Sequence, residues 1–192
     1  PGLEEILKKN FKQKRLIFTS DLNKAVKNSD IIFVCVGTPS KKNTNSANLK
    51  HVFSVVNDLK NLITKYKIII IKSTVPVSTG DEIEKVLINL KKKKLVDIVS
   101  NPEFLREGEA IRDFVYPDRI IIGTDSKKAN KILKSLYLPI IKKTNRYFNT
   151  SRRGAELIKS ASNAFLATKI SFINELANLC EKANVDVKDI SL

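Results

Sequence analysis

The chain of 192 residues has no methionine and no tryptophan, and only one histidine and two cysteines. Cys35 and Cys180 lie far apart within apolar segments, which excludes a disulfide framework and a clustered zinc site. Long apolar runs are absent too, because Ile31 to Val36 is far shorter than the ~18 residues that span a bilayer. No basic, apolar and small-residue pattern typical of a secretion signal opens the chain. We therefore expect a soluble protein of a reducing, cytoplasmic compartment, without a membrane partner.

Acidic residues are in the minority, with 20 against 35 basic ones and a formal net charge of +15. The excess is spread over pairs and short runs such as Lys91 to Lys94, and most of it is lysine. Lysine presents point charges rather than the forked contacts that favour phosphate and base recognition. We interpret the surplus as a solvated surface and expect no specific nucleic-acid partner. The alternative from a different class is a basic nucleic-acid-binding module without catalysis, whose binding would weaken steeply as salt is raised.

Apolar segments of strand length alternate with segments of helical period over the first 150 residues. A helix from about Ala47 to Thr64, for example, is apolar at positions that follow the 3.6-residue period. The expected strands cover residues 15–19, 31–36, 67–71, 96–99, 119–123 and 146–149, and the expected helices cover 21–28, 47–64, 79–90 and 126–136, with a short helix ending at Asp113. This alternation predicts an α/β fold, a partial Rossmann-type doubly wound parallel sheet with helices on both faces. Its central strands should be buried and continuously apolar.

The last segment differs, because residues 151 to 183 contain no proline and a single glycine. As one α-helix this segment would be roughly 45 to 50 Å long, too long to pack across one small sheet. We expect it to reach a second domain or a second subunit. The sequence thus predicts a first domain of residues 1–150, followed in residues 151–192 by the start of a central helical domain.

Three polar motifs directly follow three of the predicted strands. They occupy residues 37–40 (GTPS), 72–76 (KSTVP) and 100–108 (SNPEFLREG). In an open α/β sheet the carboxyl ends of the strands form the ligand-binding crevice, so the three motifs should meet there. The proline in each motif has a second explanation, since proline also ends a strand that has no further ladder partner.

A nucleotide cofactor is the expected ligand of such a crevice, yet glycine is scarce. The six glycines include no G-x-G-x-x-G spacing and no P-loop, so the backbone amides that would hold a pyrophosphate are missing. The chain also begins at Pro1 without a methionine and ends at Leu192 within a helical pattern. We therefore expect a fragment of a longer protein whose first strand and turn lie upstream.

Five motifs in order resemble the UDP-glucose 6-dehydrogenases of the UDP-glucose/GDP-mannose dehydrogenase family. The matching segments are VGTP at 36–39, KSTVPVSTG at 72–80, NPEFLREG at 101–108, PDRIIIG at 117–123 and AELIKSASNAFLATKISFINELANLCEKANVDV at 155–187. The resemblance implies NAD as cofactor and UDP-glucose as substrate. The sugar C6 alcohol would be oxidised to a carboxylate in two steps and four electrons, through a thiohemiacetal and a thioester on a cysteine.

The resemblance has further consequences for the whole protein. The cysteine nucleophile would lie beyond Leu192, so the chain alone should be inactive. The long helix would build a homodimer. GDP-mannose or another nucleotide sugar is the alternative substrate.

By the same resemblance, four residues are expected to take part in the reaction. Lys159 and Asn163 are four apart on one helix face, where they would stabilise an oxyanion at C6. Glu103 would be the general acid or base of thioester hydrolysis, and Thr74 would hold the catalytic water. Without the family, a lysine and an asparagine at this spacing usually form only a solvated helix face.

The resemblance also assigns binding residues around this group. The substrate would contact Glu103, Phe104, Leu105, Arg106, Glu107, Lys159 and Asn163, with amides from the backbone of residues 104 and 105. The NAD site would be lined by Val36, Gly37, Thr38, Pro39, Ser40, Ser73, Thr74 and Glu107. Ser40 and Ser73 have an alternative role as capping or turn residues. His51 matches no motif and is expected to be a surface or half-buried residue, and no metal cluster is expected.

Overall fold

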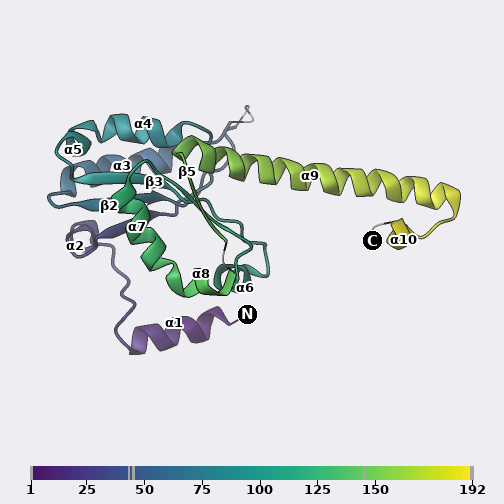
Figure 1. Ribbon diagram of the computed structural model, residues 1–192, viewed down its shortest axis with the longest axis horizontal. Coiled ribbons are helices and arrows are strands. Elements are labelled where there is room, and N and C mark those ends of the chain that lie inside the picture. The colour runs from purple at the N-terminus through teal and green to yellow at the C-terminus, as the bar shows by residue number, and fades with distance from the viewer. Residues whose placement is uncertain (1, 43, 45, 145, 191–192) are drawn as a thin grey trace.

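A five-stranded sheet forms the centre of the protein (Figure 1). The computed structural model describes residues 2–42, 44, 46–144 and 146–190, except the side chains of 142–144. Positions 43 and 45 of the expected loop over 40–46, and the chain end at 191–192, lie outside the described residues. The strands are β1 (Ile31–Val34), β2 (Lys67–Ile71), β3 (Val96–Ser100), β4 (Ile120–Gly123) and β5 (Tyr147–Thr150), and they follow one another across the sheet in this order.

Most neighbouring strands are parallel, as the alternating pattern predicts. β1 pairs with β2, β2 with β3, and β4 with β5 in parallel. The junction of β3 and β4 is antiparallel and is held by the pair Ser100 and Gly123, so the expectation of a wholly parallel sheet is wrong there. The reason is that the chain after β3 runs on past the carboxyl edge of the sheet and enters β4 from that side. The amino end of β4 therefore lies beside the loop that follows β3.

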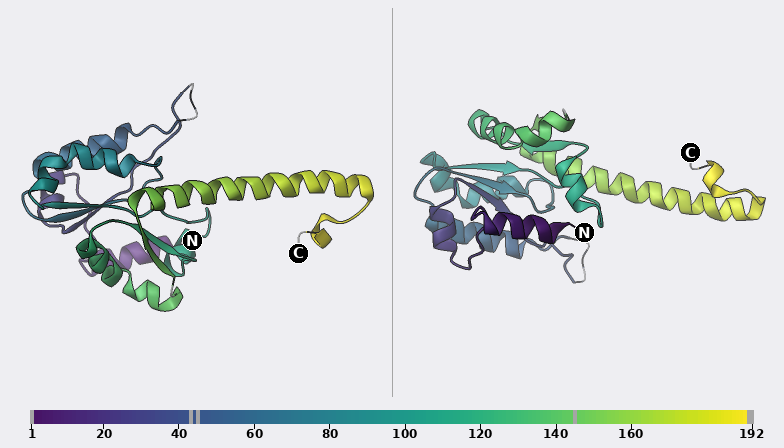
Figure 2. Two further views of the ribbon diagram at one scale, coloured as in Figure 1. Left: turned by 45° about the horizontal axis from the view of Figure 1, so that its top comes forward. Right: turned by 90° about the horizontal axis from the view of Figure 1, so that it is seen from below.

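Helices cover both faces of the sheet, which confirms the doubly wound arrangement (Figure 2). They are α1 (Leu3–Lys12), α2 (Leu22–Lys27), α3 (Lys50–Leu62), α4 (Thr79–Val86), α5 (Ile88–Lys92), α6 (Ala110–Val115), α7 (Lys127–Leu136), α8 (Leu138–Thr144), α9 (Arg152–Ala183) and α10 (Val187–Ile190). Because side chains alternate along a strand, Ile69 and Ile71 of β2 join the core under α3 and α4, while Ile68 and Ile70 join the core under α7. All four isoleucines are buried.

Two sequence expectations at the start of the sheet are wrong. Residues 15–19 form no strand, and Ile17 and Phe18 are 75% and 71% exposed, because no neighbouring strand in the described chain offers this segment a ladder. The strand expected over 31–36 ends at Val34, and it lies at the edge of the sheet. Phe33 and Cys35 are consequently exposed, so Cys35 does not lie inside a buried strand.

Two helical details also differ from the expectation. The helix expected over 79–90 is interrupted at the buried Leu87, which separates α4 from α5. α8 is not predicted by the sequence pattern because it contains Pro139. That proline stands at the second helical position, where its missing N–H removes no intrahelical hydrogen bond.

The long helix α9 projects away from the sheet, as its uninterrupted pattern predicts (Figures 1 and 2). It begins where the Ser151 hydroxyl accepts a hydrogen bond from the Gly154 amide, and it ends at Asn184 in the left-handed conformation. Its buried residues lie in the first turns, apart from Cys180 near the far end. Between them the helix presents exposed apolar side chains, namely Leu157, Phe165, Leu166, Ile170, Phe172 and Leu179. The domain boundary at residue 150 stays a prediction.

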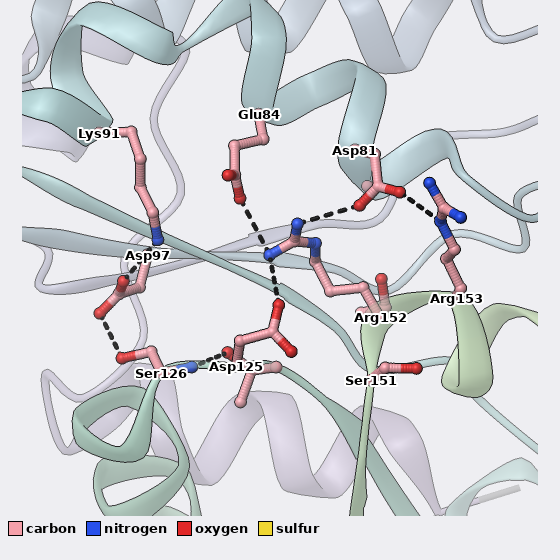
Figure 3. A network of polar contacts seen from close by, with 12 residues as sticks. Asp81, Glu84, Lys91, Asp97, Asp125, Ser126, Ser151, Arg152 and Arg153 are labelled. Atoms are coloured by element: carbon pink, nitrogen blue, oxygen red, sulfur yellow. Dashed lines mark hydrogen bonds and ion pairs between the residues drawn. The ribbon is translucent and has the colours of Figure 1, made fainter.

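Ion pairs hold the first turn of α9 to α4 and to the segment after β4 (Figure 3). Arg152 lies 2.9 Å from both Asp81 and Glu84 of α4 and 3.4 Å from Asp125 after β4. Arg153 donates to the other oxygen of Asp81, and these two guanidinium groups lower the pKa of that carboxyl. The described chain contains no helix that is long and apolar enough to cross a membrane.

Candidate active site

The carboxyl ends of β1, β2 and β3 meet at one edge of the sheet, so the three motifs converge as the topology predicts. Side chains join the first two motifs directly. The Thr38 hydroxyl donates to the Thr74 carbonyl at 2.8 Å, and the Ser73 hydroxyl donates to the Val36 carbonyl at 2.7 Å. These contacts hold the loop after β1 beside the loop after β2 at the carboxyl edge of the sheet. Ser40 forms an isolated antiparallel bridge with Ala47 beyond them.

A pocket of about 340 Å³ opens beside the third motif, between the loop after β3, the amino end of β4 and the first turns of α9. The sequence-predicted residues that line it are Glu103, Phe104, Leu105, Arg106, Lys159 and Asn163. The family resemblance therefore selects residues that share one cavity although they come from two distant segments of the chain.

Lys159 and Glu103 form the central pair of this pocket. The Lys159 ammonium lies 3.1 Å from one Glu103 oxygen, and the Leu105 amide donates to the other oxygen at 2.6 Å. The lysine is only 7% exposed, whereas about a third of the Glu103 side chain is accessible. A buried cation is thus held against an accessible carboxylate, an arrangement suited to proton transfer and to stabilising negative charge.

The Phe104 ring lies close to two cations, and the sequence does not predict one of them, Arg119. The Arg119 guanidinium stands 4.6 Å from the centre of its ring, and the Lys159 ammonium stands 5.3 Å from it. Arg119 also donates to the Ser162 hydroxyl on α9 at 2.9 Å. Through these contacts Phe104 links the loop after β3 to the start of β4 and to α9. Cation–π contacts are stronger where they are shielded from water.

Lys72, at the end of β2, is a second lining residue that the sequence analysis did not assign to the site. It donates long hydrogen bonds to the Asn101 side chain and the Pro102 carbonyl. Burial lowers the pKa of Lys72 to about 8, and nearby Glu103 opposes this fall. Asn101 is buried and also accepts from the Tyr137 hydroxyl at 2.6 Å. This network fixes the turn that presents Glu103.

Several predicted residues lie at the margin of the pocket or outside it. Arg106 lines the pocket, but its guanidinium is engaged by Asp113, whose pKa it lowers to about 2. Glu107 is exposed and is not among the lining residues. Ser73 borders a separate small cavity that it shares with Lys159. His51 is exposed, which agrees with its expected role as a surface residue.

The edge of the sheet offers a fitting place for part of a dinucleotide. Gly37 is exposed, and the space beyond its Cα is open, so a ligand can approach the backbone closely there. The hydroxyls of Thr38 and Ser73 each keep lone pairs that a ribose hydroxyl can donate to. Within the described part of the chain, no group of histidine, cysteine, aspartate or glutamate residues is arranged to hold a metal ion.

Comparison with known proteins assigns the chain to a family. Residues 1–141 match the NAD-binding domain of the UDP-glucose/GDP-mannose dehydrogenase family, and residues 153–192 match its central domain. The chain belongs to the UDP-glucose/GDP-mannose dehydrogenase family. This confirms the resemblance and NAD as the family's cofactor.

Individual relatives in the UDP-glucose/GDP-mannose dehydrogenase family agree over the whole chain. UDP-glucose 6-dehydrogenase of Rhizobium meliloti is 44% identical over all of this chain, which spans 44% of that relative. The structure of a UDP-glucose dehydrogenase from Pyrobaculum islandicum matches with a TM-score of 0.88 and 36% identity, covering 99% of this chain and 44% of that one. GDP-mannose dehydrogenase of Pseudomonas aeruginosa matches with a TM-score of 0.88 and 31% identity, over 100% and 44% of the two chains. The chain thus spans less than half the length of these family members.

Proposed function

We propose that the complete protein oxidises the C6 alcohol of UDP-glucose to a carboxylate and reduces two NAD molecules for each sugar. The observation that carries this proposal is the contact of 3.1 Å between buried Lys159 and accessible Glu103 in the pocket. Names of relatives at about 44% identity support the substrate. The overall reaction consumes one alcohol, two NAD⁺ and one water, and it yields one carboxylate, two NADH and three protons.

Each residue of the pair has a chemical role in this proposal. Loss of a hydride from C6 requires negative charge to develop on the C6 oxygen, and Lys159 together with Asn163 stabilises that charge. Glu103 accepts the proton of the water that hydrolyses the acyl intermediate, because its accessible carboxylate faces the same cavity. Thr74 positions this water by its place at the end of β2. The backbone of residues 104 and 105 binds the sugar.

When bound, NAD would supply the hydride acceptor for this chemistry. Val36 to Ser40, together with Ser73 and Thr74, bind its ribose and nicotinamide portion, and Glu107 borders it. The exposed Gly37 and the paired loops support this placement.

The proposed intermediates are a thiohemiacetal and a thioester on a cysteine thiol, as the family resemblance implies. Among the residues that the structure describes, neither Cys35 nor Cys180 lines the pocket that contains Glu103 and Lys159. Although Cys35 is exposed as a residue, partial desolvation of its thiol raises its pKa, which disfavours the nucleophilic thiolate. Cys180 is buried near the far end of α9. The proposal therefore takes the nucleophile from another part of the complete protein, and the chain by itself is expected to be inactive.

The apolar side chains along α9 support a second part of the proposal, a homodimer built through this helix. A single exposed leucine is ordinary on a protein surface, but Phe165, Leu166, Ile170 and Phe172 lie within eight residues of one helix. The protein is proposed to act in the cytoplasm, in nucleotide-sugar metabolism that supplies polysaccharide synthesis.

The alternative substrate is GDP-mannose, because a GDP-mannose dehydrogenase is among the structures with a TM-score of 0.88. A substrate panel on the complete protein separates the two. We expect kcat/KM with UDP-glucose to exceed that with GDP-mannose by at least about 100-fold, since unpaired polar groups penalise the wrong base and sugar. A higher kcat/KM with GDP-mannose would support the proposed oxidation at C6 but would contradict UDP-glucose as the substrate.

A further inference from the structure

Glu156 of α9 is a buried carboxylate that no role above uses. It is 3% exposed and lies on the helix three residues before Lys159. Its Oε2 accepts a hydrogen bond from the Ser78 amide at 2.7 Å, and its Oε1 accepts from the Gly80 amide at 2.9 Å and from the Ser100 hydroxyl at 3.1 Å. One side chain thus contacts the segment after β2 and the end of β3.

The contacts with the two backbone amides replace a missing helix cap. Ser78 precedes α4 in the left-handed conformation (φ 78°), and its own side chain makes no capping hydrogen bond. Glu156 supplies the acceptor for the free amides at the start of α4, where a negative charge also interacts favourably with the helix dipole. The carboxylate therefore fixes α9 relative to α4.

The contact with Ser100 is linked to the pair in the pocket. Ser100 lies three residues before Glu103, just as Glu156 lies three residues before Lys159. The hydrogen bond from Ser100 to Glu156 therefore joins the same two segments that carry Glu103 and Lys159, the end of β3 and the start of α9. Both Ser100 and Glu156 are buried. The cavity that Ser100, Glu156 and Lys159 share holds only about 10 Å³, which leaves little room for α9 to slide.

Gly80 shows how closely this contact is packed. A Cβ at this position would stand 3.0 Å from Glu156 Oε1 and 3.3 Å from the Ser100 hydroxyl. The carboxylate is thus closely packed against the start of α4, where two backbone amides donate to its oxygens.

We propose that Glu156 is a positioning residue, whose buried carboxylate sets the register of α9 against the ends of β2 and β3 and so holds the Lys159 ammonium at Glu103. The expected change in kcat rests on the proposed function. The expected change in the position of Lys159 relative to Glu103 does not. Glu156 itself does not line the larger pocket.

Glu156→Gln in the complete protein is the sharpest test. The amide keeps the shape of the side chain but places an NH₂ group opposite one of the two backbone amides, since these donate to different oxygens. We expect kcat to fall roughly 10- to 100-fold, because a misplacement near 1 Å has effects of this size, while KM for NAD changes little. Ser100→Ala removes one of the three contacts and should lower kcat by a smaller factor.

Ile83→Val is the stability-matched control, because Ile83 is buried in α4 and touches the core rather than the pocket. It should lower the Tm by a few degrees and leave kcat at its original value. Arg153→Gln removes the exposed ion pair with Asp81 and should also leave kcat unchanged. A purely structural role for Glu156 predicts that all these variants follow one relation between Tm and kcat.

A crystal structure of Glu156→Gln tests the inference without any activity. We expect the Lys159 ammonium to lie at least about 1 Å further from Glu103 than in the original protein. An unchanged distance, or an unchanged kcat in an active and folded variant, would overturn the inference. If Glu156→Gln does not fold, Ser100→Ala is judged by the same distance and the same kcat. An original protein that reduces no NAD with any nucleotide sugar would refute the proposed function alone, and the crystallographic distance would still decide the inference.

Discussion

Replacing Lys159 by alanine in the complete protein is expected to lower kcat by roughly 1,000-fold. The ammonium is the buried cation nearest to Glu103, at 3.1 Å, and it faces the cavity where the C6 oxygen would become negative. In a site shielded from water, loss of such a group leaves that charge with one fewer partner at the moment of reaction. The KM for NAD should stay nearly constant, because the loops proposed to bind the cofactor lie at the ends of β1 and β2. Initial rates of NADH formation give both constants.

A lysine far from the pocket provides the matched control. Lys60 is exposed on α3 and contributes the same charge to the protein. Lys60→Ala should retain the original kcat. A Lys159→Ala variant that is folded and keeps more than about a tenth of the original kcat would remove Lys159 from the chemistry.

Gly123→Ala is expected to have the largest effect on stability. A Cβ at this position would stand 2.6 Å from the Ala155 Cβ, 2.7 Å from the Ser151 carbonyl and 2.9 Å from the Arg152 Cα. Two of these neighbours are backbone atoms of the start of α9, so the added methyl group must push the helix away from β4. We expect the free energy of unfolding to fall by about 2–4 kcal/mol, at the upper end of overpacking effects. Urea titration followed by far-ultraviolet circular dichroism measures it.

Gly37→Ala is the control for this substitution. The space around its Cβ position is empty to 4 Å, and its backbone is not in the left-handed region. The same change of residue should therefore alter the free energy of unfolding by less than about 1 kcal/mol. Equal losses in the two variants would show that the packing of α9 on β4 is looser than described.

The sequence was most informative where a local pattern of apolar residues, or the absence of proline, determines the element by itself. β2 is a run of four isoleucines after a lysine, and α9 is a long stretch without proline, so both were placed to within a residue. The convergence of the three motifs followed from parallel topology alone. The family motifs then selected Glu103 and Lys159, which lie 56 residues apart and meet in the pocket.

Other features depend on partners that no local pattern indicates. The direction of β4 is set by the path of the chain after β3, and the failure of residues 15–19 to form a strand reflects the lack of a neighbour. Arg119 gains its role from Phe104 and from Ser162, and Glu156 gains its role from Ser78 and Ser100, all outside its own element. A lone charged residue in a strand or helix ordinarily indicates a solvated surface. Ser78 gives no sequence signal for Glu156, because a serine before a helix is typical of an ordinary N-cap. Only the structure shows its left-handed backbone and its missing capping hydrogen bond.

The proposed function is tested most directly by the number of NADH molecules formed for each sugar consumed. The complete protein is incubated with limiting UDP-glucose and excess NAD until absorbance at the NADH band is constant. We expect two NADH per sugar with a carboxylate at C6, since the aldehyde stage would remain bound until it is oxidised again. One NADH per sugar with a released aldehyde, or no NADH with any nucleotide sugar, would contradict it.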